Sequence, residues 1–292
     1  MKVALFGMSP TQVSMPYIQQ LIRKLEEVDS RIWVYEPYFR TLEKSVTFNS
    51  VPKLFNTHTD LLDMVDYLLS IGGDGTFLDT VKLVQDSGIP VLGINLGRLG
   101  FLSSIPKDEI ALAINALVNK DFKLVPRILI KLKTEEELFG EINYGLNEVS
   151  IRRRDSSSLM VLHVYVDGEM LNSYWADGLI IATPTGSTAY SLSCGGPIIA
   201  PGSKNFVITP IATHNLTVRP IVIPDDSKIR IELEGRDKQF LVSLDSRTES
   251  INKPVVLNIE KETFNINLIQ MSGKNFFSTI RDKLKWGLDI RN

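Results

Sequence analysis

The sequence predicts an N-terminal α/β domain with an open parallel sheet, a β-rich second domain, and a last helix that returns to the first domain. Three observations lead to this prediction. The chain has 292 residues, a usual length for two domains. Strand-like and helix-like segments alternate up to residue 120, as they do where helices connect parallel strands. From residue 121 the helical period gives way to short runs rich in β-branched residues, separated by turn signals.

The first domain, residues 1–120, carries buried-strand runs and amphipathic helices in turn. Apolar side chains recur at helical spacing in its predicted helices, for example Leu78, Val81 and Val84. Gly88 lies just past the end of that helix, where a glycine commonly ends one. We expect strands over Val3–Gly7, Arg31–Tyr35, Tyr67–Ile71 and Val91–Asn95, and helices over Tyr17–Leu25, Phe77–Gln85 and Ile105–Asn119.

The second domain, residues 121–274, has almost no helical period. Turn signals such as Asp167-Gly168 separate its apolar runs. In the last segment, residues 275–292, the spacing of Phe277, Ile280 and Leu284 predicts a helix that packs back on the α/β domain. Within the second domain we expect strands over Ile128–Lys133, Val149–Ile151, Leu159–Val166, Leu179–Ala182, Ile229–Leu233, Phe240–Leu244 and Val255–Ile259.

Composition and charge exclude several classes of protein. The 32 basic and 34 acidic residues nearly balance, and no long basic stripe predicts nucleic-acid binding. The single cysteine, Cys194, cannot form an intramolecular disulfide, and no Cys/His cluster has metal-site spacing. The N-terminal apolar run is too short for a signal peptide, and no stretch reaches the roughly 18 apolar residues of a membrane helix. We therefore expect a cytoplasmic protein with no nucleic-acid or membrane partner.

A glycine-rich loop joins a predicted strand to a predicted helix at Ser70–Thr76. Glycines leave no Cβ between backbone amides and a ligand, and Thr76 suits the N-cap of the helix, where free amides favour an anion. Asp74 is the one carboxylate in this loop. Ligands of open α/β sheets bind at the carboxyl ends of the strands. A tight turn capped by Asp is the alternative, but the paired glycines before it favour a binding site.

The common phosphate-binding motifs are missing from the sequence. It contains neither G-x-G-x-x-G nor G-x-x-x-x-G-K-[ST], and the protein-kinase signatures are not there either. Any phosphate site is therefore of another type.

A second segment, Thr183–Gly196, is rich in hydroxyl side chains and glycine and follows the predicted strand at Ala182. Such groups can bond phosphate, ribose and adenine edges without adding charge. Cys194 lies within it and is interpreted as a small packing residue, because no histidine lies nearby in sequence to activate it. The adjacent pair Asn147-Glu148 is a weaker signal, since taken alone a surface turn is its default interpretation.

Together these segments resemble the NAD kinases in order and spacing, over about Gly72 to Trp286. The run from Thr183 to Tyr190 is the specific part of the resemblance, because the GGDG element also resembles diacylglycerol kinases and, more loosely, 6-phosphofructokinases. The matching motifs are Gly73-Asp74-Gly75-Thr76, Gly93-Ile94-Asn95, Leu99-Gly100-Phe101-Leu102, Asn147-Glu148, Asp177-Gly178, Thr183-Pro184-Thr185-Gly186-Ser187-Thr188-Ala189-Tyr190, His214 and Arg219-Pro220-Ile221-Val222-Ile223-Pro224.

The resemblance implies an α/β domain, a β-sandwich-like domain, ATP and NAD as substrates, a divalent metal such as Mg²⁺ with ATP, and a homodimer or homotetramer. Asp74 would be the catalytic carboxylate, and Asn147 and Glu148 would hold the ribose and base of the substrate. The substrate- and nucleotide-binding residues that it implies are Gly73, Gly75, Thr76, Asn95, Asn147, Glu148, Asp177, Thr185, Thr188, Ala189, Tyr190, Ser191, Leu192, Ser193, His214 and Arg247.

The chain departs from the family pattern at two positions that bear on substrate details, including the use of NADH. Asp245-Ser246-Arg247 stands where many members have Asp-Gly-Gln or Asp-Ser-Gln, and Trp175 stands where a basic residue is common.

The expected reaction is phosphoryl transfer from ATP to the 2′-hydroxyl of the adenosine ribose of NAD. Such transfer depends on positioning and charge neutralisation, and a carboxylate within reach of the hydroxyl can accept its proton. Asp74 fits that role, although a role as metal ligand stays open, since hard cations also bind carboxylates. A lipid kinase that shares the GGDG loop and a non-catalytic NAD(P) sensor are the alternative functions.

Overall fold

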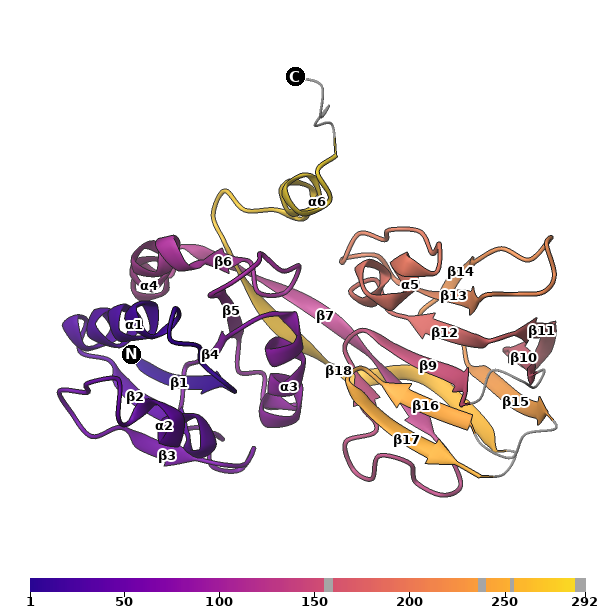
Figure 1. Cartoon of the computed structure of the whole chain (residues 1–292), viewed down its shortest axis with the longest axis horizontal. Coiled ribbons are helices and arrows are strands. Elements are labelled where there is room, and N and C mark those ends of the chain that lie inside the picture. Colours follow the sequence, from indigo (N-terminus) through magenta and orange to yellow (C-terminus); the bar gives the residue numbers. More distant parts are fainter. Residues whose placement is uncertain (155–159, 236–239, 253–254, 287–292) are drawn as a thin grey trace. The chain divides into compact units, whose positions relative to one another are not determined.

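The computed structural model describes residues 1–154, 160–235, 240–252 and 255–286. It divides into two compact units (Figure 1). The first contains residues 1–126 and the described part of the chain from residue 266 onward, and the second contains residues 127–265. Of the predicted elements, Leu159 and residues 287–292 lie outside the described residues.

The first unit is built on a parallel sheet in the order β3-β2-β1-β4-β5-β18, with β6 also paired to β5. Each neighbouring pair in this part of the sheet runs parallel, which confirms the predicted open α/β architecture. The strands are β1 (Lys2–Gly7), β2 (Arg31–Tyr35), β3 (Lys53–Phe55), β4 (Tyr67–Ile71), β5 (Val91–Asn95), β6 (Ile105–Pro106) and the last residues of β18 (Val256–Met271).

Helices cover both faces of this sheet. The helices α1 and α4 pack on one face, where alternate strand residues such as Leu92 and Ile94 join their core. The intervening Gly93 faces the opposite side and lies against Phe77 of α3, so α3 covers the second face. The helices of the unit are α1 (Met15–Glu27), α2 (Glu36–Leu42), α3 (Asp74–Val84), the short 3₁₀ helix η1 (Lys107–Glu109), α4 (Ile110–Asn119) and α6 (Phe276–Leu284).

The helix predicted over Ile105–Asn119 is wrong at its first two residues, and the next three, Lys107–Glu109, form the 3₁₀ helix η1 and not an α-helix. Ile105 and Pro106 form β6 instead, and the α-helix begins only at Ile110. Pro106 holds an extended backbone (φ −74°, ψ 156°), and the residue before a proline is disfavoured in helical conformation, so the chain pairs with β5 before it coils.

The second unit is an antiparallel β structure with two sheets. One sheet has the order β14-β13-β12-β9-β16-β17, and the other contains β11-β10-β15-β18 with β7 and β8. Its strands are β7 (Phe122–Lys133), β8 (Tyr144–Gly145), β9 (Glu148–Arg153), β10 (Met160–Val166), β11 (Glu169–Ala176), β12 (Gly178–Ala182), β13 (Asn205–Ile211), β14 (Ile221–Pro224), β15 (Ile229–Gly235), β16 (Phe240–Leu244), β17 (Arg247–Ile251) and the first part of β18.

One hydrophobic core lies between the two sheets of this unit. Leu162 of β10 and Ile231 of β15 contribute to it from one sheet, and Ile151 of β9 and Ile181 of β12 from the other. This arrangement confirms the β-rich, sandwich-like domain. On the outer side of β12, the short helices η2 (Gly186–Thr188) and α5 (Tyr190–Ser193) follow the strand.

The final helix α6 is present and belongs to the first unit. Its N-terminus is closed by a capping box, in which the Asn275 side chain accepts from the amide of Ser278 and the Ser278 hydroxyl accepts from the amide of Asn275. Among the helices of the described residues, none is long and apolar enough to cross a membrane.

Candidate functional site

The glycine-rich loop lies where β4 passes into α3. Gly72 has a φ of +155°, and a Cβ at this residue would lie 2.4 Å from the Thr76 hydroxyl, so only glycine fits the turn. Gly73 is the N-cap, and the helix begins at Asp74. The prediction that Thr76 is the N-cap is therefore wrong, because the two glycines complete the turn earlier and leave Thr76 in the first turn. The free amides at this helix end favour an anion.

A cavity of about 310 Å³ opens beside this helix end, at the carboxyl ends of β1, β4 and β5. Gly72, Gly73 and Thr76 line one part of it, and Asn95 and Arg98 line another. The buried Asn95 amide donates to the Arg98 carbonyl at 2.5 Å, and its oxygen accepts from the Gly97 amide at 2.7 Å. Asn95 thus shapes the loop after β5, and that loop places a guanidinium group at a cavity that glycine amides also line.

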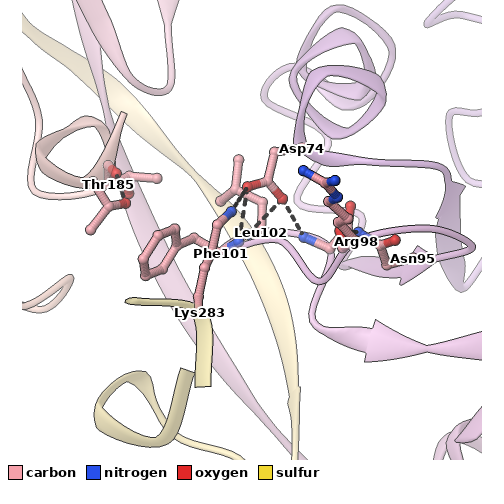
Figure 2. A network of polar contacts seen from close by, with 9 residues as sticks. Asp74, Asn95, Arg98, Phe101, Leu102, Thr185 and Lys283 are labelled. Carbon is pink, nitrogen blue, oxygen red and sulfur yellow. Dashed lines mark hydrogen bonds and ion pairs between the residues drawn. The ribbon is translucent and has the colours of Figure 1, made fainter. Parts of the chain in front are cut away.

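The Asp74 carboxylate is held by three backbone amides of the loop that follows β5 (Figure 2). Phe101 donates to Oδ2 at 2.8 Å, and Leu102 and Ser103 donate to Oδ1 at 3.0 and 2.9 Å. A Cβ on Gly100 would lie only 1.9 Å from Oδ1, so this approach requires glycine. The three donors fix the direction of the carboxylate.

A lysine from the final helix also reaches Asp74. The Lys283 ammonium lies 3.5 Å from Oδ2 of Asp74 and 4.6 Å from the centre of the Phe101 ring (Figure 2). Both partners of the ion pair keep about a third of their side-chain surface exposed. The carboxylate of the loop is therefore in contact with a cation as well as with backbone donors.

In the second unit, Asn147 and Glu148 lie at the start of β9. Glu148 is opposite Ala182 of β12, and Val149 is opposite Leu244 of β16. Asp245, which follows β16, accepts hydrogen bonds from the amides of Leu146, Asn147 and Glu148 at 2.7, 2.8 and 3.1 Å. This carboxylate therefore fixes the backbone of the Asn147-Glu148 pair.

Glu148 is nine-tenths buried, and its Oε2 atom has no hydrogen-bond partner among the described residues. Burial, together with the nearby Asp245 carboxylate, raises the pKa of Glu148 to about 8. Burial also raises the pKa of the Asp245 carboxyl, against the opposing effect of the three amides and of Arg247. Glu148 is thus mostly protonated at neutral pH and can donate a hydrogen bond as well as accept one.

The hydroxyl-rich segment uses several of its hydroxyls to hold its own shape. Thr183 donates to the Leu146 carbonyl at 2.6 Å, Ser187 donates to the Pro184 carbonyl at 2.7 Å, and the hydroxyls of Ser191 and Thr209 lie 2.9 Å apart. These residues of the segment are buried, as is Thr185. The surface of the segment is formed instead by partly or fully exposed residues, namely Thr188, Ala189, Tyr190, Leu192, Ser193, Cys194 and Gly195.

Thr183 connects this segment to the Asn147-Glu148 pair, because its amide donates to the Asn147 carbonyl at 2.8 Å. Gly186 lies equally close, since a Cβ there would be 2.1 Å from the same carbonyl oxygen. The structure thus brings these two predicted segments together within the second unit. Cys194 packs against the apolar cluster under α5, and burial raises the pKa of its thiol, in keeping with a packing residue.

Asp177 and His214 lie at the other end of β12. Asp177 precedes the strand and pairs with Arg153 at 2.8 Å, and the His214 amide donates to the Trp175 carbonyl at 2.8 Å. Since β12 has five residues, about 3.3 Å apart, this end lies roughly 15 Å from Glu148. Two groups of predicted binding residues therefore occupy opposite ends of one strand.

Arg247 holds a loop of the second unit. Its guanidinium donates to the carbonyls of Ile142 and Tyr144 and lies 5.5 Å from the Phe139 ring. The departure from the family pattern at this position thus makes contacts within the chain itself.

Three contacts of the site were not predicted from the sequence, although Leu99–Leu102 and Asp245–Arg247 were identified there as motifs. These contacts are the amides of Phe101–Ser103 on Asp74, the anchoring of Asn147 by Asp245, and the approach of Lys283. Gly100 was the available hint for the first, since a glycine in a non-repetitive loop often marks a close approach.

Two family descriptions match this chain. Residues 16–122 match the ATP-NAD kinase N-terminal domain, and residues 146–271 match the ATP-NAD kinase C-terminal domain. The chain is 45% identical over 291 residues to an NAD kinase of Cytophaga hutchinsonii, with 99% of each chain covered. It is 40% identical over 292 residues to an NAD kinase of Bacteroides fragilis, with both chains fully covered.

Solved structures show the same fold. Yeast NADH kinase, in complex with NADH, superposes with a TM-score of 0.86 at 25% identity, over 100% of this chain and 89% of that one. An NAD kinase from Archaeoglobus fulgidus, in complex with ATP, superposes with a TM-score of 0.73 at 23% identity, over 98% of this chain and 99% of that one.

Proposed function

The chain belongs to the ATP-NAD kinase family, and on that premise we propose that it transfers the terminal phosphoryl group of ATP to the 2′-hydroxyl of the adenosine ribose of NAD, giving NADP. The observation that carries the proposal is the setting of Asp74. Its carboxylate is fixed by three amides at the start of α3, beside a cavity lined by glycines at the carboxyl end of the parallel sheet. A negative phosphate group and a fixed proton acceptor both suit that place.

The proposed role of Asp74 is to accept the proton of the attacking hydroxyl. Each of its two oxygens carries backbone hydrogen bonds, but an ionised carboxylate has about four lone-pair directions, so acceptor capacity is left. The free amides of α3 and the guanidinium of Arg98 would stabilise phosphate charge, which is the main requirement of a loose phosphoryl-transfer transition state.

A divalent metal is part of the proposal through the donor. Among the described residues, no group of three or more His, Cys, Asp or Glu side chains is placed to hold a metal ion. Mg²⁺ commonly keeps several waters and binds substrate phosphates with one or two carboxylates, and Asp74 could supply one. The residues fit a metal held mainly by ATP. When bound, Mg²⁺ would neutralise phosphate charge.

For the acceptor, we propose that Asn147 and Glu148 hold the ribose and base of NAD. The buried, unpartnered Oε2 of Glu148 supports this, because a buried polar atom without a partner is costly and a ligand hydroxyl or ring nitrogen would satisfy it. Thr188, Tyr190 and Ser193, which are not fully buried, are the proposed contacts from the hydroxyl-rich segment.

The proposal includes the cellular compartment, the oligomeric state and the partners of the protein. A cytoplasmic homodimer or homotetramer with no nucleic-acid or membrane partner fits the family resemblance and the near balance of 32 basic and 34 acidic residues. Light scattering on the eluate of a size-exclusion column would test the oligomer: a mass of two or four chains agrees with the proposal, and a monomer contradicts it.

The direct test incubates purified protein with ATP, Mg²⁺ and NAD and detects NADP with an NADP-specific dehydrogenase. We expect NADP to form in proportion to enzyme, none to form without ATP, and at least about 10²-fold less to form with Asp74→Asn at the same enzyme concentration. Tight NAD binding without any NADP would indicate a sensor and contradict the proposal. Phosphorylation of diacylglycerol in place of NAD would indicate the lipid-kinase alternative.

A further inference from the structure

The C-terminal helix α6 brings a lysine to the proposed catalytic carboxylate, although almost two hundred and ten residues separate the two in sequence. From this geometry we infer that Lys283 is a binding residue for the distal phosphates of the nucleoside triphosphate donor, and that it rests on Asp74 when no donor is bound. The inference rests on the proposed function and assigns a further residue to its donor site.

The segment that carries Lys283 is anchored to the first unit. Lys274, just before α6, forms an ion pair with Glu109 of η1 at 2.8 Å, and its carbonyl accepts from the Gln270 side chain at 2.7 Å. The Asn275–Ser278 capping box then fixes the start of the helix, and Ile280 is buried. The backbone of Lys283, two turns further along the helix, is therefore held in position. Its ammonium group can still move, because it is carried on a flexible four-carbon chain.

Asp74 has no need of Lys283 for its own stability. The carboxylate already accepts three amide hydrogen bonds, which satisfy a carboxylate even without a cation. The Nζ–Oδ2 distance of 3.5 Å is too long for a strong charge-assisted hydrogen bond, and the pair is about one-third exposed. Exposed pairs of this kind contribute little to folding. The contact thus leaves Lys283 able to exchange its partner.

Without Lys283, a donor phosphate beside Asp74 would lie next to the negative charge of the carboxylate with no cation between them. If Asp74 accepts the proton of the attacking hydroxyl, the transferring phosphoryl group must lie nearby, and two anions repel each other strongly in a partly desolvated site. An ammonium group 3.5 Å from the carboxylate offsets that repulsion, and it can turn toward the phosphate oxygens. The face of Phe101, 4.6 Å away, holds the cation at this point without using any of its three N–H donors.

The test measures binding, so that loss of turnover cannot obscure it. A non-hydrolysable ATP analogue, inorganic triphosphate and AMP are titrated into the full chain by calorimetry, with Lys283→Gln, Lys283→Arg and the control Arg281→Gln. Arg281 is an exposed cation in the last turn of the same helix, and its loss changes the net charge equally. Thermal melting of each variant checks that it is folded.

We expect Lys283→Gln to weaken the ATP analogue and inorganic triphosphate by about tenfold, as the loss of one charge-assisted contact does, and to leave AMP within twofold. Lys283→Arg should recover most of the affinity, and Arg281→Gln should retain it. Unchanged triphosphate affinity in Lys283→Gln, or equal weakening of AMP, would overturn the inference.

The same Lys283 substitution, made in the Asp74→Asn variant, distinguishes a direct contact with phosphate from an effect of Lys283 through Asp74. In Asp74→Asn, Lys283→Gln should still weaken the ATP analogue by a similar factor, because the contact is with phosphate. If the effect vanishes there, Lys283 acts only through Asp74 and the inference is wrong. If the wild-type chain binds neither the analogue nor triphosphate, the proposed function fails as well, whereas normal binding that is insensitive to Lys283 defeats the inference alone.

Discussion

Asp74 in the first unit and Glu148 in the second are both acidic residues at the end of an interior strand, β4 and β9 respectively, yet their surroundings differ. Asp74 accepts three backbone amides, contacts Lys283 and keeps about 30% of its side chain exposed. Glu148 is 9% exposed, one of its oxygens has no partner among the described residues, and its neighbour Asp245 is another carboxyl group. The first environment offers the carboxylate hydrogen-bond donors and a cation, whereas the second raises the pKa of Glu148 to about 8 and favours a neutral acid.

The two environments suit a carboxyl group to two different tasks. A proton acceptor beside phosphates must be fixed in direction, and three amide donors hold Asp74 in this way. A group that recognises hydroxyls or a base edge gains from being able to donate as well as accept, which a protonated carboxyl can do. The residues around each acid, more than the acid itself, therefore determine the role that we assign to it.

The largest effect is expected at Asp74. Asp74→Asn keeps the shape of the side chain but removes its charge. The new NH₂ group also faces a backbone N–H that donated to the carboxylate, so turnover should fall by at least about 10²-fold. Steady-state NADP formation at saturating ATP and NAD measures this. Asp79→Asn on the same helix is the control, because the Asp79 carboxylate forms an ion pair with Lys82, three residues further along the helix, and it should keep normal turnover. An Asp74→Asn enzyme with near-normal turnover would exclude Asp74 as proton acceptor and as metal ligand.

Asp245 should be the next most sensitive position, through stability. In Asp245→Asn the amide group cannot accept from all three backbone donors of Leu146–Glu148, and one buried N–H is left unpaired. We expect a loss of about 1–3 kcal/mol in the free energy of unfolding, measured by urea denaturation. Ser246→Ala, at the exposed neighbour, should cost under about 0.5 kcal/mol. Equal stability of Asp245→Asn and wild type would show that these bonds do not anchor the loop.

The raised pKa of Glu148 predicts a pH-dependent effect. Glutamate titrates near 4.5 in the unfolded chain and near 8 in the folded chain, so between these values only the folded chain retains the proton. The stability associated with that proton is complete below about pH 4.5 and is lost as the pH rises through about 8. Glu148→Gln removes this loss. Its stability relative to wild type should therefore rise by at least about 1 kcal/mol between roughly pH 5 and pH 9.

Urea denaturation of both proteins across that pH range measures the difference. Glu249→Gln, at an exposed glutamate of β17, is the matched control and should run parallel to wild type. If the curve for Glu148→Gln is also parallel to that of wild type, the pKa of Glu148 is not raised by folding. The proposed difference between Glu148 and Asp74 would then be wrong.

The smallest effect is expected from the hydroxyl-rich segment. If Thr188 and Ser193 contact the adenine end of NAD, Thr188→Val and Ser193→Ala should lower kcat/KM for NAD by about three- to tenfold and lower it less for the hypoxanthine analogue. Ser191→Ala removes a buried hydroxyl bonded to Thr209 and should instead reduce stability without changing the preference between the two dinucleotides. An equal loss on both dinucleotides in Thr188→Val and Ser193→Ala would mean that these hydroxyls do not recognise the base.

Local patterns were enough to predict much of the fold. The strands Tyr67–Ile71 and Val91–Asn95 and the glycine loop between β4 and α3 follow from short apolar runs and glycines. The strand expected over Val255–Ile259 extends to Met271, because charged residues such as Glu260 and Glu262 conceal its pattern. Lys133 and Lys131 neutralise those two side chains from β7.

The contacts that tune the site could not be predicted in this way. Phe101 lies 27 residues from Asp74, and Leu146 lies 99 residues from Asp245, so neither hydrogen bond leaves a local period in the sequence. The same holds for Lys283, whose spacing identifies it only as a residue on an amphipathic helix. Likewise, the pKa of Glu148 depends on burial and on a partner that only the folded chain supplies.

In the proposed mechanism Asp74 acts on the transfer step and Glu148 holds the acceptor, so the NAD affinities of an Asp74 variant and a Glu148 variant should differ. Calorimetric titration of NAD into Asp74→Asn and Glu148→Ala, each compared with wild type, gives the two dissociation constants. We predict that Asp74→Asn binds NAD within about threefold of wild type, and that Glu148→Ala binds it at least about tenfold more weakly. Strong loss of NAD binding in Asp74→Asn together with normal binding in Glu148→Ala would contradict the account.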